Sequence, residues 1–232
     1  MGLENMLKRI FLVCCGLFVA GLIYSFLALQ VNNEITPEDT EAIGTLAVQE
    51  ICGVEAKSYA DELACIVAIQ GAVQAIGTER CTDKKDSVEP GEFLKRGYGC
   101  CNDRARFIEK AARHYGFETR HVFLIEPKWG AWSNALPLGQ GSHATSEVKT
   151  SRGWLGVDAN HPFILVDQNN HPLTYILAMD KPGELGMEPL GFYSQELDII
   201  YGLYSRHGNF HGTNFPGPEF VISEVFYNLY GG

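Results

Sequence analysis

The feature that most constrains this chain is an uncharged, apolar stretch of 22 residues from Ile10 to Val31, IFLVCCGLFVAGLIYSFLALQV. A helix of roughly 20 residues can cross the hydrocarbon core of a bilayer, so we predict a transmembrane signal anchor over residues 10–31. A cleaved secretory signal is the alternative, with a shorter apolar region of about 7–15 residues and an A-x-A-like site. Here Phe26 stands two positions before Ala28, which favours a retained anchor.

The charges that flank this stretch predict its orientation. Lys8 and Arg9 precede it, and four acidic residues follow it between positions 34 and 41. The positive-inside rule therefore places residues 1–9 in the cytoplasm. We expect a single-pass membrane protein whose remaining residues lie outside the cytoplasm, in a periplasm or at the cell surface.

Composition limits the possible partners. The formal net charge is -10 and no basic block interrupts the sequence, so a polyanion would be repelled and nucleic-acid binding is not expected. Apolar residues make up 46% and charged residues 20% of the chain, which is normal for a globular domain with a core.

Periodicity predicts helices first and strands afterwards. Apolar spacing, capping residues and glycine stops predict helices over Pro37–Cys52, Ser58–Ile76 and Cys101–Tyr115, with a helical turn at Glu92–Arg96. Extended patterns predict strands over Thr119–Ile125, His143–Lys149 and Gly153–Val157, with weaker signals at Phe163–Val166 and Ile176–Ala178. This order predicts an α+β domain in which helices pack on an antiparallel sheet.

We expect this domain to cover residues 34–191. Residues 192–232 are rich in aromatic residues, glycine and proline. They are predicted to form an extension packed on the domain, and a separate binding platform for sugar or peptide is the alternative.

Three residues suggest thiol chemistry. Acyl transfer by a thiol needs a thiolate, a histidine that takes and returns its proton, and a group that orients the histidine. Cys101 stands at the start of a predicted helix, where the positive end of the helix dipole lowers a thiol pKa. His143 begins one predicted strand and Asp158 follows the next, so a short turn between these strands can bring the two side chains together.

The run from Gly97 to Arg120, GYGCCNDRARFIEKAARHYGFETR, resembles the core motif of the transglutaminase-like superfamily. The run from His143 to Asp158 is similar to the strand, turn and terminal aspartate of that family, and the resemblance covers roughly residues 58–166. It implies a transglutaminase-like, papain-like cysteine proteinase fold with a catalytic triad of Cys101, His143 and Asp158, and no cofactor. Two positions depart from the family pattern: Thr145 replaces a frequent tryptophan, and Ala159 a frequent proline.

Several residues are competing candidates. By analogy with the family, the oxyanion hole would use the Cys101 backbone N–H and a second donor, for which Tyr98 and Trp132 are weak candidates. His161 is a rival base and Asn160 a rival orienting group, although the family spacing disfavours both. His207 and His211 could suggest a metal pair, but no further ligand stands at suitable spacing, so no metal is expected.

The cysteines outside the predicted anchor suggest disulfides. If Cys101 stays free, the four others allow three connectivities, and an oxidising compartment favours pairing. We predict Cys52–Cys65 and Cys81–Cys100, because each closes a short loop. Cys14 and Cys15 lie inside the anchor.

The expected function is that of a membrane-anchored thiol enzyme acting on amide bonds through a cysteine thioester. Peptides or proteins are the expected substrates, and those of the cell envelope are candidates. Water would make it a peptidase or amidase, and an amine would make it a cross-linking transglutaminase; a small domain without a calcium loop favours hydrolysis. The alternatives are a catalytically silent scaffold or binding module, and a thiol–disulfide exchanger using Cys100 and Cys101, which lack the C-x-x-C spacing.

Overall fold

The computed structural model describes residues 3–28, 30–53, 58–81, 87–126, 141–180, 193, 197–204 and 219–230. The chain divides into two compact units, Met1–Gln30 and Val31–Gly232. Each unit is described by itself.

The first unit is a single helix, α1 (Leu3–Ala28). All side chains from Lys8 to Tyr24 are exposed, including large apolar ones such as Phe18, of which 68% is exposed. Among the residues that the structure describes, no helix meets the length and hydropathy needed to cross a membrane.

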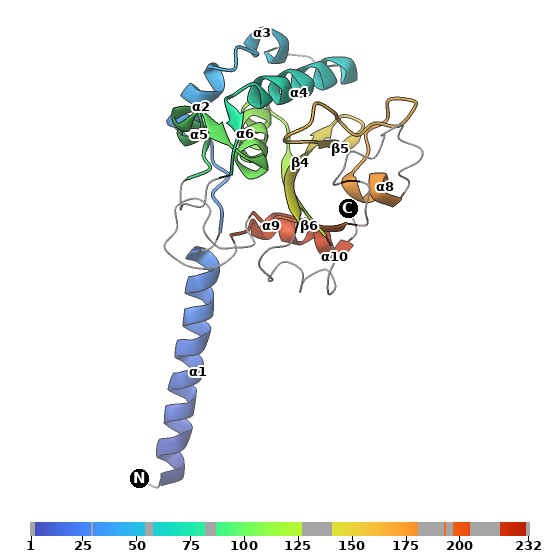
Figure 1. Ribbon diagram of the computed structural model, residues 1–232. Helices are drawn as coiled ribbons and strands as arrows, with labels where there is room; N and C mark the ends of the chain where they lie inside the picture. Colours follow the sequence, from blue (N-terminus) through green and yellow to red (C-terminus); the bar gives the residue numbers. More distant parts are fainter. Residues whose placement is uncertain are drawn as a thin grey trace. The chain divides into compact units, whose positions relative to one another are not determined.

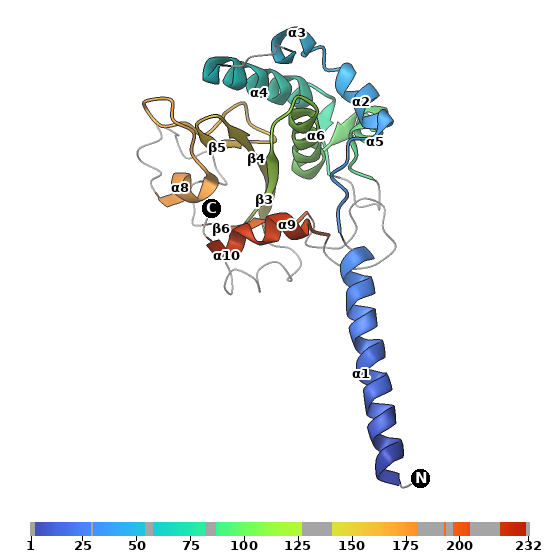
Figure 2. The same ribbon diagram turned by 180° about the vertical axis from the view of Figure 1, so that it is seen from behind.

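The second unit is built on a four-stranded antiparallel sheet with the order β5–β4–β3–β6 (Figures 1 and 2). The strands are β3 (Thr119–Ile125), β4 (Ser142–Thr150), β5 (Gly153–Val157) and β6 (Asp198–Tyr201). A separate pair of short parallel strands, β1 (Thr78–Glu79) and β2 (Tyr98–Gly99), precedes in the chain the helix that begins at Cys101.

Helices pack on the sheet and on one another. They are α2 (Pro37–Gly44), α3 (Gln49–Cys52), α4 (Tyr59–Gln74), α5 (Pro90–Arg96), α6 (Cys101–His114), α8 (Tyr175–Asp180), α9 (Ile222–Val225) and α10 (Tyr227–Tyr230). Helices α4 and α6 lie on one side of the sheet and α8 lies on the other, while α9 and α10 lie beside β6 (Figures 1 and 2).

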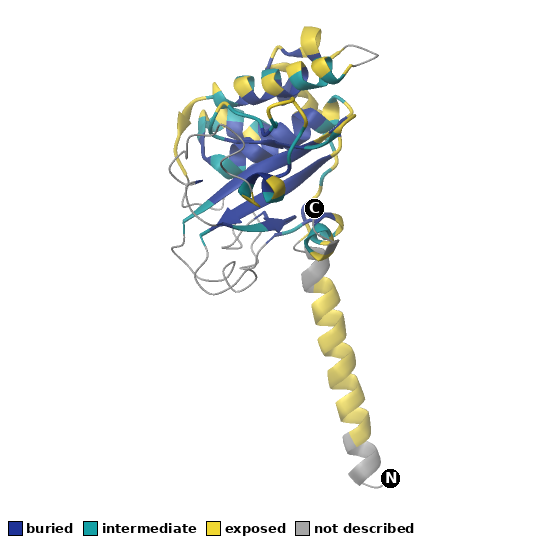
Figure 3. Cartoon of the chain, turned by 90° about the vertical axis from the view of Figure 1, so that its right-hand side faces the viewer, coloured by how far each residue is buried: buried dark blue, intermediate teal, exposed yellow. Residues whose placement is uncertain are grey.

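The alternation of β3 shows how the layers are held. Phe123 and Ile125 pack with Ala105 of α6, whereas Val122 and Leu124 pack with Tyr175 of α8 on the opposite face. Both faces of the sheet are therefore buried, as the dark strands of Figure 3 show. A sheet covered on both sides can hold polar side chains away from water, which matters for the site described below.

The predicted elements agree with the structure over most of the domain. The helices at Ser58–Ile76, Glu92–Arg96 and Cys101–Tyr115 correspond to α4, α5 and α6, and the three main strands to β3, β4 and β5. The mixed helix and sheet fold is consistent with a transglutaminase-like domain.

Some predictions were wrong. The single helix over Pro37–Cys52 is broken between α2 and α3, where Ala47 has a φ of 55° that an α-helix cannot accommodate. The segment Ile176–Ala178 lies in a helix, α8, and not in a strand. Phe163–Val166 forms only isolated bridges. Strand β6 was not predicted.

The disulfide predictions divide in the same way. Cys52 and Cys65 form a bridge that links α3 to α4, so that pairing is confirmed. Cys81 and Cys100 are free thiols, so the second predicted bridge is wrong for this structure. The Cys100 thiol donates to Asn102 Oδ1 at 2.6 Å instead.

Candidate active site

Cys101 is the first residue of α6, and its neighbours fix the start of that helix. Gly97 ends α5 with a φ of 66°, a left-handed conformation that glycine adopts without steric cost. A Cβ at Gly99 would lie only 2.7 Å from the Phe93 ring, so a larger residue would push the turn apart. Asp103 closes a capping box with Cys100, accepting the Cys100 N–H at 2.9 Å.

The capping box explains why an acidic residue, Asp103, stands two positions after Cys101. The Asp103 carboxylate also forms an ion pair with Arg96 at 2.5 Å, which ties the end of α5 to the start of α6. The Cys101 thiol is thereby held at the helix N-terminus, where unpaired N–H groups favour a negative charge.

His143 and Asp158 come from neighbouring antiparallel strands. The pairing of Ser146 with Val157 places the start of β4 next to the residue that follows β5. His143 Nε2 lies 2.9 Å from Asp158 Oδ2, and both side chains are buried. Since Nε2 faces the carboxylate, Nδ1 is the ring nitrogen left for the hydrogen bond that His143 makes with Cys101.

The Asp158 carboxylate accepts five hydrogen bonds. Oδ1 receives the backbone N–H of Asn160 at 2.8 Å, the backbone N–H of His161 at 2.6 Å, and His161 Nδ1 at 3.0 Å. Oδ2 receives His143 and the hydroxyl of Tyr193. A carboxylate with no exposed surface is stable as an anion only with such compensation.

The environment shifts all three candidate groups toward their charged forms. Burial acts to raise the pKa of Asp158, yet hydrogen bonds from His143, His161 and Tyr193 leave it below its usual range. Burial also opposes the His143 imidazolium, but Asp158 and Cys101 raise the pKa of His143 to about 10. The site therefore favours an imidazolium beside an aspartate anion.

The surroundings of the Cys101 thiol also favour its charged form. A hydrogen bond from Cys100 does most to lower the pKa of Cys101, burial opposes it, and the hydrogen bond and charge of His143 lower it further. The backbone N–H of Ala144 also bonds to this sulfur. The pKa of Cys101 ends well below its ordinary value, whereas contact with Cys101 and Cys81 raises the pKa of Cys100. Of the adjacent cysteines, Cys101 is therefore the one suited to carry the thiolate.

Two glutamines of α4 that sequence reasoning missed hold the chain around Asp158. Gln70 Nε2 donates to the carbonyls of Asp158 at 2.9 Å and Phe163 at 2.7 Å, and Gln74 Nε2 donates to the carbonyl of His161 at 2.8 Å. Their spacing of four residues puts both on one helix face, but nothing in the sequence indicates that this face meets the loop after β5.

Tyr193 was missed as well. It belongs to the predicted aromatic extension and reaches Asp158 from 35 positions further along the chain. The only sequence signal was the aromatic richness of that extension.

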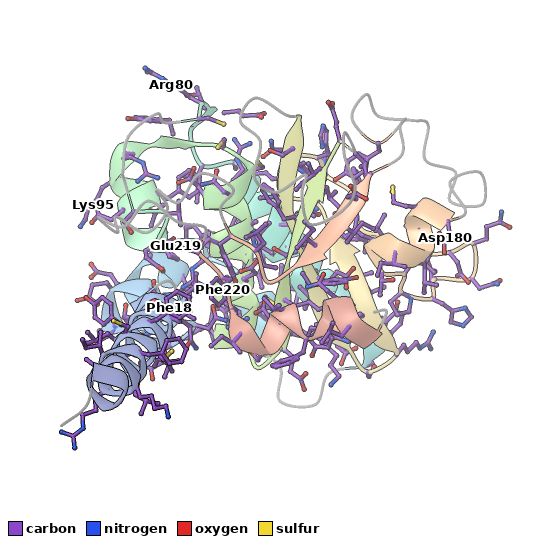
Figure 4. All side chains as sticks on the ribbon, turned by 90° about the horizontal axis from the view of Figure 1, so that it is seen from below. Phe18, Arg80, Lys95, Asp180, Glu219 and Phe220 are labelled. Atoms are coloured by element: carbon purple, nitrogen blue, oxygen red, sulfur yellow. A yellow bond between two sulfur atoms is a disulfide. The ribbon has the colours of Figure 1, made fainter. Side chains whose placement is uncertain are left out.

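The other candidate residues named from the sequence have different partners. The His161 ring binds the second oxygen of Asp158, whereas the Asn160 side chain is directed away from Asp158 and donates to Glu79 at 2.8 Å. Tyr98 begins β2, where the Arg80 guanidinium lies 5.3 Å from its ring centre; Arg80 itself points outward from the domain (Figure 4). Trp132, His207 and His211 lie outside the described residues.

One cluster has a composition suited to a metal. Ligand atoms of His143, Asp158 and His161 all lie within 4.8 Å of one another. Both Asp158 oxygens already accept hydrogen bonds from these imidazoles, so a cation would have to displace the protons they share. The hydrogen bonding accounts for the arrangement of these groups.

Residues 52–159 match the family model described as the transglutaminase-like superfamily. No curated protein is significantly similar to the chain in sequence. Four chains of solved structures are significantly similar. Among them is the crystal structure of Rad4–Rad23 bound to a 6-4 photoproduct UV lesion, with 12% identity and a TM-score of 0.39; the match covers 77% of this chain and 45% of that chain. The chain thus spans less than half the length of that structure's chain.

Proposed function

Because residues 52–159 match the family model of the transglutaminase-like superfamily, we propose that this protein is a cysteine enzyme that acts on amide bonds of peptides or proteins. The observation that carries the proposal is the position of His143 between the other two residues. One ring nitrogen bonds to Asp158, and the ring also makes a hydrogen bond with the Cys101 side chain. Cysteine enzymes are typical of this superfamily.

In the proposed first step, the Cys101 thiolate attacks the carbonyl carbon of the amide, forming the C–S bond and an oxyanion. The His143 imidazolium gives its proton to the leaving nitrogen as the C–N bond breaks, which leaves a thioester and a neutral imidazole. The backbone N–H of Cys101 at the helix N-terminus is suited to stabilise the oxyanion.

In the second step, neutral His143 accepts a proton from water or an amine as that group attacks the thioester. Collapse of the intermediate breaks the C–S bond and returns the thiolate and the imidazolium. Water yields a carboxylic acid, so the reaction is hydrolysis, and an amine yields a new amide. We take hydrolysis as the first activity to assay.

We also propose that α1 anchors the protein in a membrane, with the domain outside the cytoplasm. The support is the apolar composition of residues 10–31 and the exposed apolar side chains along α1, which would favour a lipid environment. Resistance of the membrane-bound chain to alkaline extraction would support the anchor, and release by alkali would contradict it.

The function is tested by labelling the full chain with iodoacetamide from pH 5 to 9 and mapping the labelled cysteines by mass spectrometry. We expect fast labelling of Cys101 at pH 6, slowed in the His143→Ala variant. The matched control is His171→Ala, because His171 pairs with Asp167 at 3.1 Å on the surface. Labelling shared among several cysteines and indifferent to His143 would refute the proposal and favour a silent scaffold.

A further inference from the structure

Tyr193 bonds to the same oxygen of Asp158 as His143, the candidate base. Its hydroxyl donates to Asp158 Oδ2, the atom that His143 Nε2 also contacts. The residue is 6% exposed, and its ring meets the His143 ring edge-on, with 6.0 Å between centres. Because a carboxylate only accepts hydrogen bonds, the hydroxyl proton of Tyr193 must point at Asp158.

A chain of contacts leads from Tyr193 back to the strand that directly precedes Asp158. The ring of Tyr193 is stacked on that of Tyr175, with 6.3 Å between the ring centres. The Tyr175 hydroxyl lies 2.8 Å from Thr145 Oγ1, which in turn donates to the Val157 carbonyl at 2.6 Å. Val157 directly precedes Asp158, so the stacked rings and the hydrogen bonds together close a ring of buried contacts around the carboxylate.

The ring also accounts for a departure from the family pattern. Thr145 stands where a tryptophan is frequent in the transglutaminase-like superfamily, two residues after His143. A tryptophan side chain has no hydroxyl group, so it could not accept a hydrogen bond from the Tyr175 hydroxyl and donate one to the Val157 carbonyl. The threonine and the two tyrosines thus form one connected unit.

We propose that Tyr193 is a positioning residue of this site, which shares the Asp158 oxygen with His143 and is itself held in place by Tyr175 and Thr145. The inference rests on the proposed function, because it concerns the same three groups. The hydroxyl dipole directs its positive end at Asp158 and so reduces the negative field that His143 and Cys101 experience. Without it, both groups would hold their protons more tightly.

The protonation states fit this role. Burial raises the pKa of both Tyr193 and Tyr175 well above the ordinary value, so both remain neutral hydroxyl groups. Within the part of the chain that the structure describes, the other titratable groups in contact with this unit include His161, on the far oxygen of Asp158, and Glu147, which accepts the Tyr175 backbone N–H at 2.7 Å. Neither of them contacts the oxygen that Tyr193 and His143 share.

The test uses the full chain and two readouts, the pH dependence of iodoacetamide labelling at Cys101 and the pH titration of the His143 Cε1–H resonance by NMR. In Tyr193→Phe, which keeps the ring and removes the donor, we expect both midpoints to move up by about one pH unit. Tyr175→Phe, which keeps the Tyr193 hydroxyl, should move them in the same direction by less. It provides the test should Tyr193→Phe fail to fold.

Tyr204→Phe is the matched control. Tyr204 is also buried, and its hydroxyl donates to Glu109 at 2.6 Å, away from Asp158, so its loss should leave both midpoints in place. A rate that falls equally at every pH with unmoved midpoints would overturn the proposal, and so would equal shifts in the control. Failure of the proposed function would look different, because Cys101 of the unmodified chain would then label with an ordinary thiol midpoint while the NMR titration of His143 still reports the effect of Tyr193.

Discussion

Replacing Asp158 with asparagine should reverse the hydrogen bond that orients His143. Three donors from Asn160 and His161 converge on Asp158 Oδ1, two of them backbone N–H groups that cannot turn away. An amide would therefore place its oxygen there and its NH₂ at the Oδ2 position. His143 Nε2 would then have to accept a proton instead of donating one, which moves the ring proton to Nδ1.

The magnitude follows from that tautomer. With its proton on Nδ1, His143 is a neutral imidazole that can neither accept the thiol proton nor form the imidazolium that stabilises the Cys101 thiolate. An aspartate-to-asparagine change that imposes the wrong tautomer lowers kcat by about 10⁴-fold in a serine protease, or about 5.5 kcal/mol of activation free energy. For a thiol returned to a pKa of about 8.5, only about 0.3% is ionised at pH 6, so labelling of Cys101 would slow by up to about 300-fold.

The assay compares labelling rates of Cys101 at pH 6 in the full chain, with the tautomer read from the ¹⁵N shifts of His143. Asp167→Asn is the matched control, because it neutralises a partly exposed aspartate that is also paired with a histidine. Fast labelling in Asp158→Asn, or a His143 that still carries its proton on Nε2, would refute the orientation argument.

Three further predictions concern stability, measured by urea unfolding. Gln70→Ala should lower the free energy of unfolding by about 2 kcal/mol, because carbonyl groups inside the domain lose their donor; a change within error would contradict that role. Replacing Cys52 and Cys65 together by alanine should cost about 3 kcal/mol while the pH profile of thiol labelling stays unchanged, and a shifted profile would link the bridge to the site. The lowered pKa of Asp158 stabilises the fold above about pH 4, and this contribution is lost as the pH falls. The raised pKa of His143 stabilises the fold below about pH 6.5, and this contribution is lost as the pH rises toward about 10, so Asp158→Asn should flatten the pH dependence of stability.

The parts of the site that the sequence could predict are those governed by local signals. Gly99 before an amphipathic run is enough to place Cys101 at a helix start, and Asp103 completes a cap within the same turn. A short polar turn between two alternating segments is enough to pair β4 with β5, which brings His143 to Asp158. Each of these inferences spans at most about one supersecondary unit.

The remaining parts depend on contacts between distant segments. Strand β6 joins the sheet beside β3, although its four residues lie more than 70 positions further along the chain and carry no periodic signal. The apolar segment of α8 is too short for periodicity to separate helix from strand, and the tertiary structure decides: Tyr175 N–H donates to Glu147, and Thr174 accepts the N–H of Leu177 at the start of the helix. Tyr193 is unpredictable for the same reason, since its partner is a single carboxylate oxygen.

The structure makes the stability of the domain and the chemistry of the site depend on the same groups. Asp158 is fully buried as an anion, which would be costly without its five donors. Those donors come from the start of β4, from the turn after β5 and from Tyr193, and α4 fixes the Asp158 carbonyl through Gln70. Loosening any of these segments therefore leaves a buried acceptor unpaired and at the same time alters the field that His143 and Cys101 experience. A change that leaves the fold intact but removes a single donor should consequently appear first in the pH dependence of thiol reactivity and only second in the unfolding free energy.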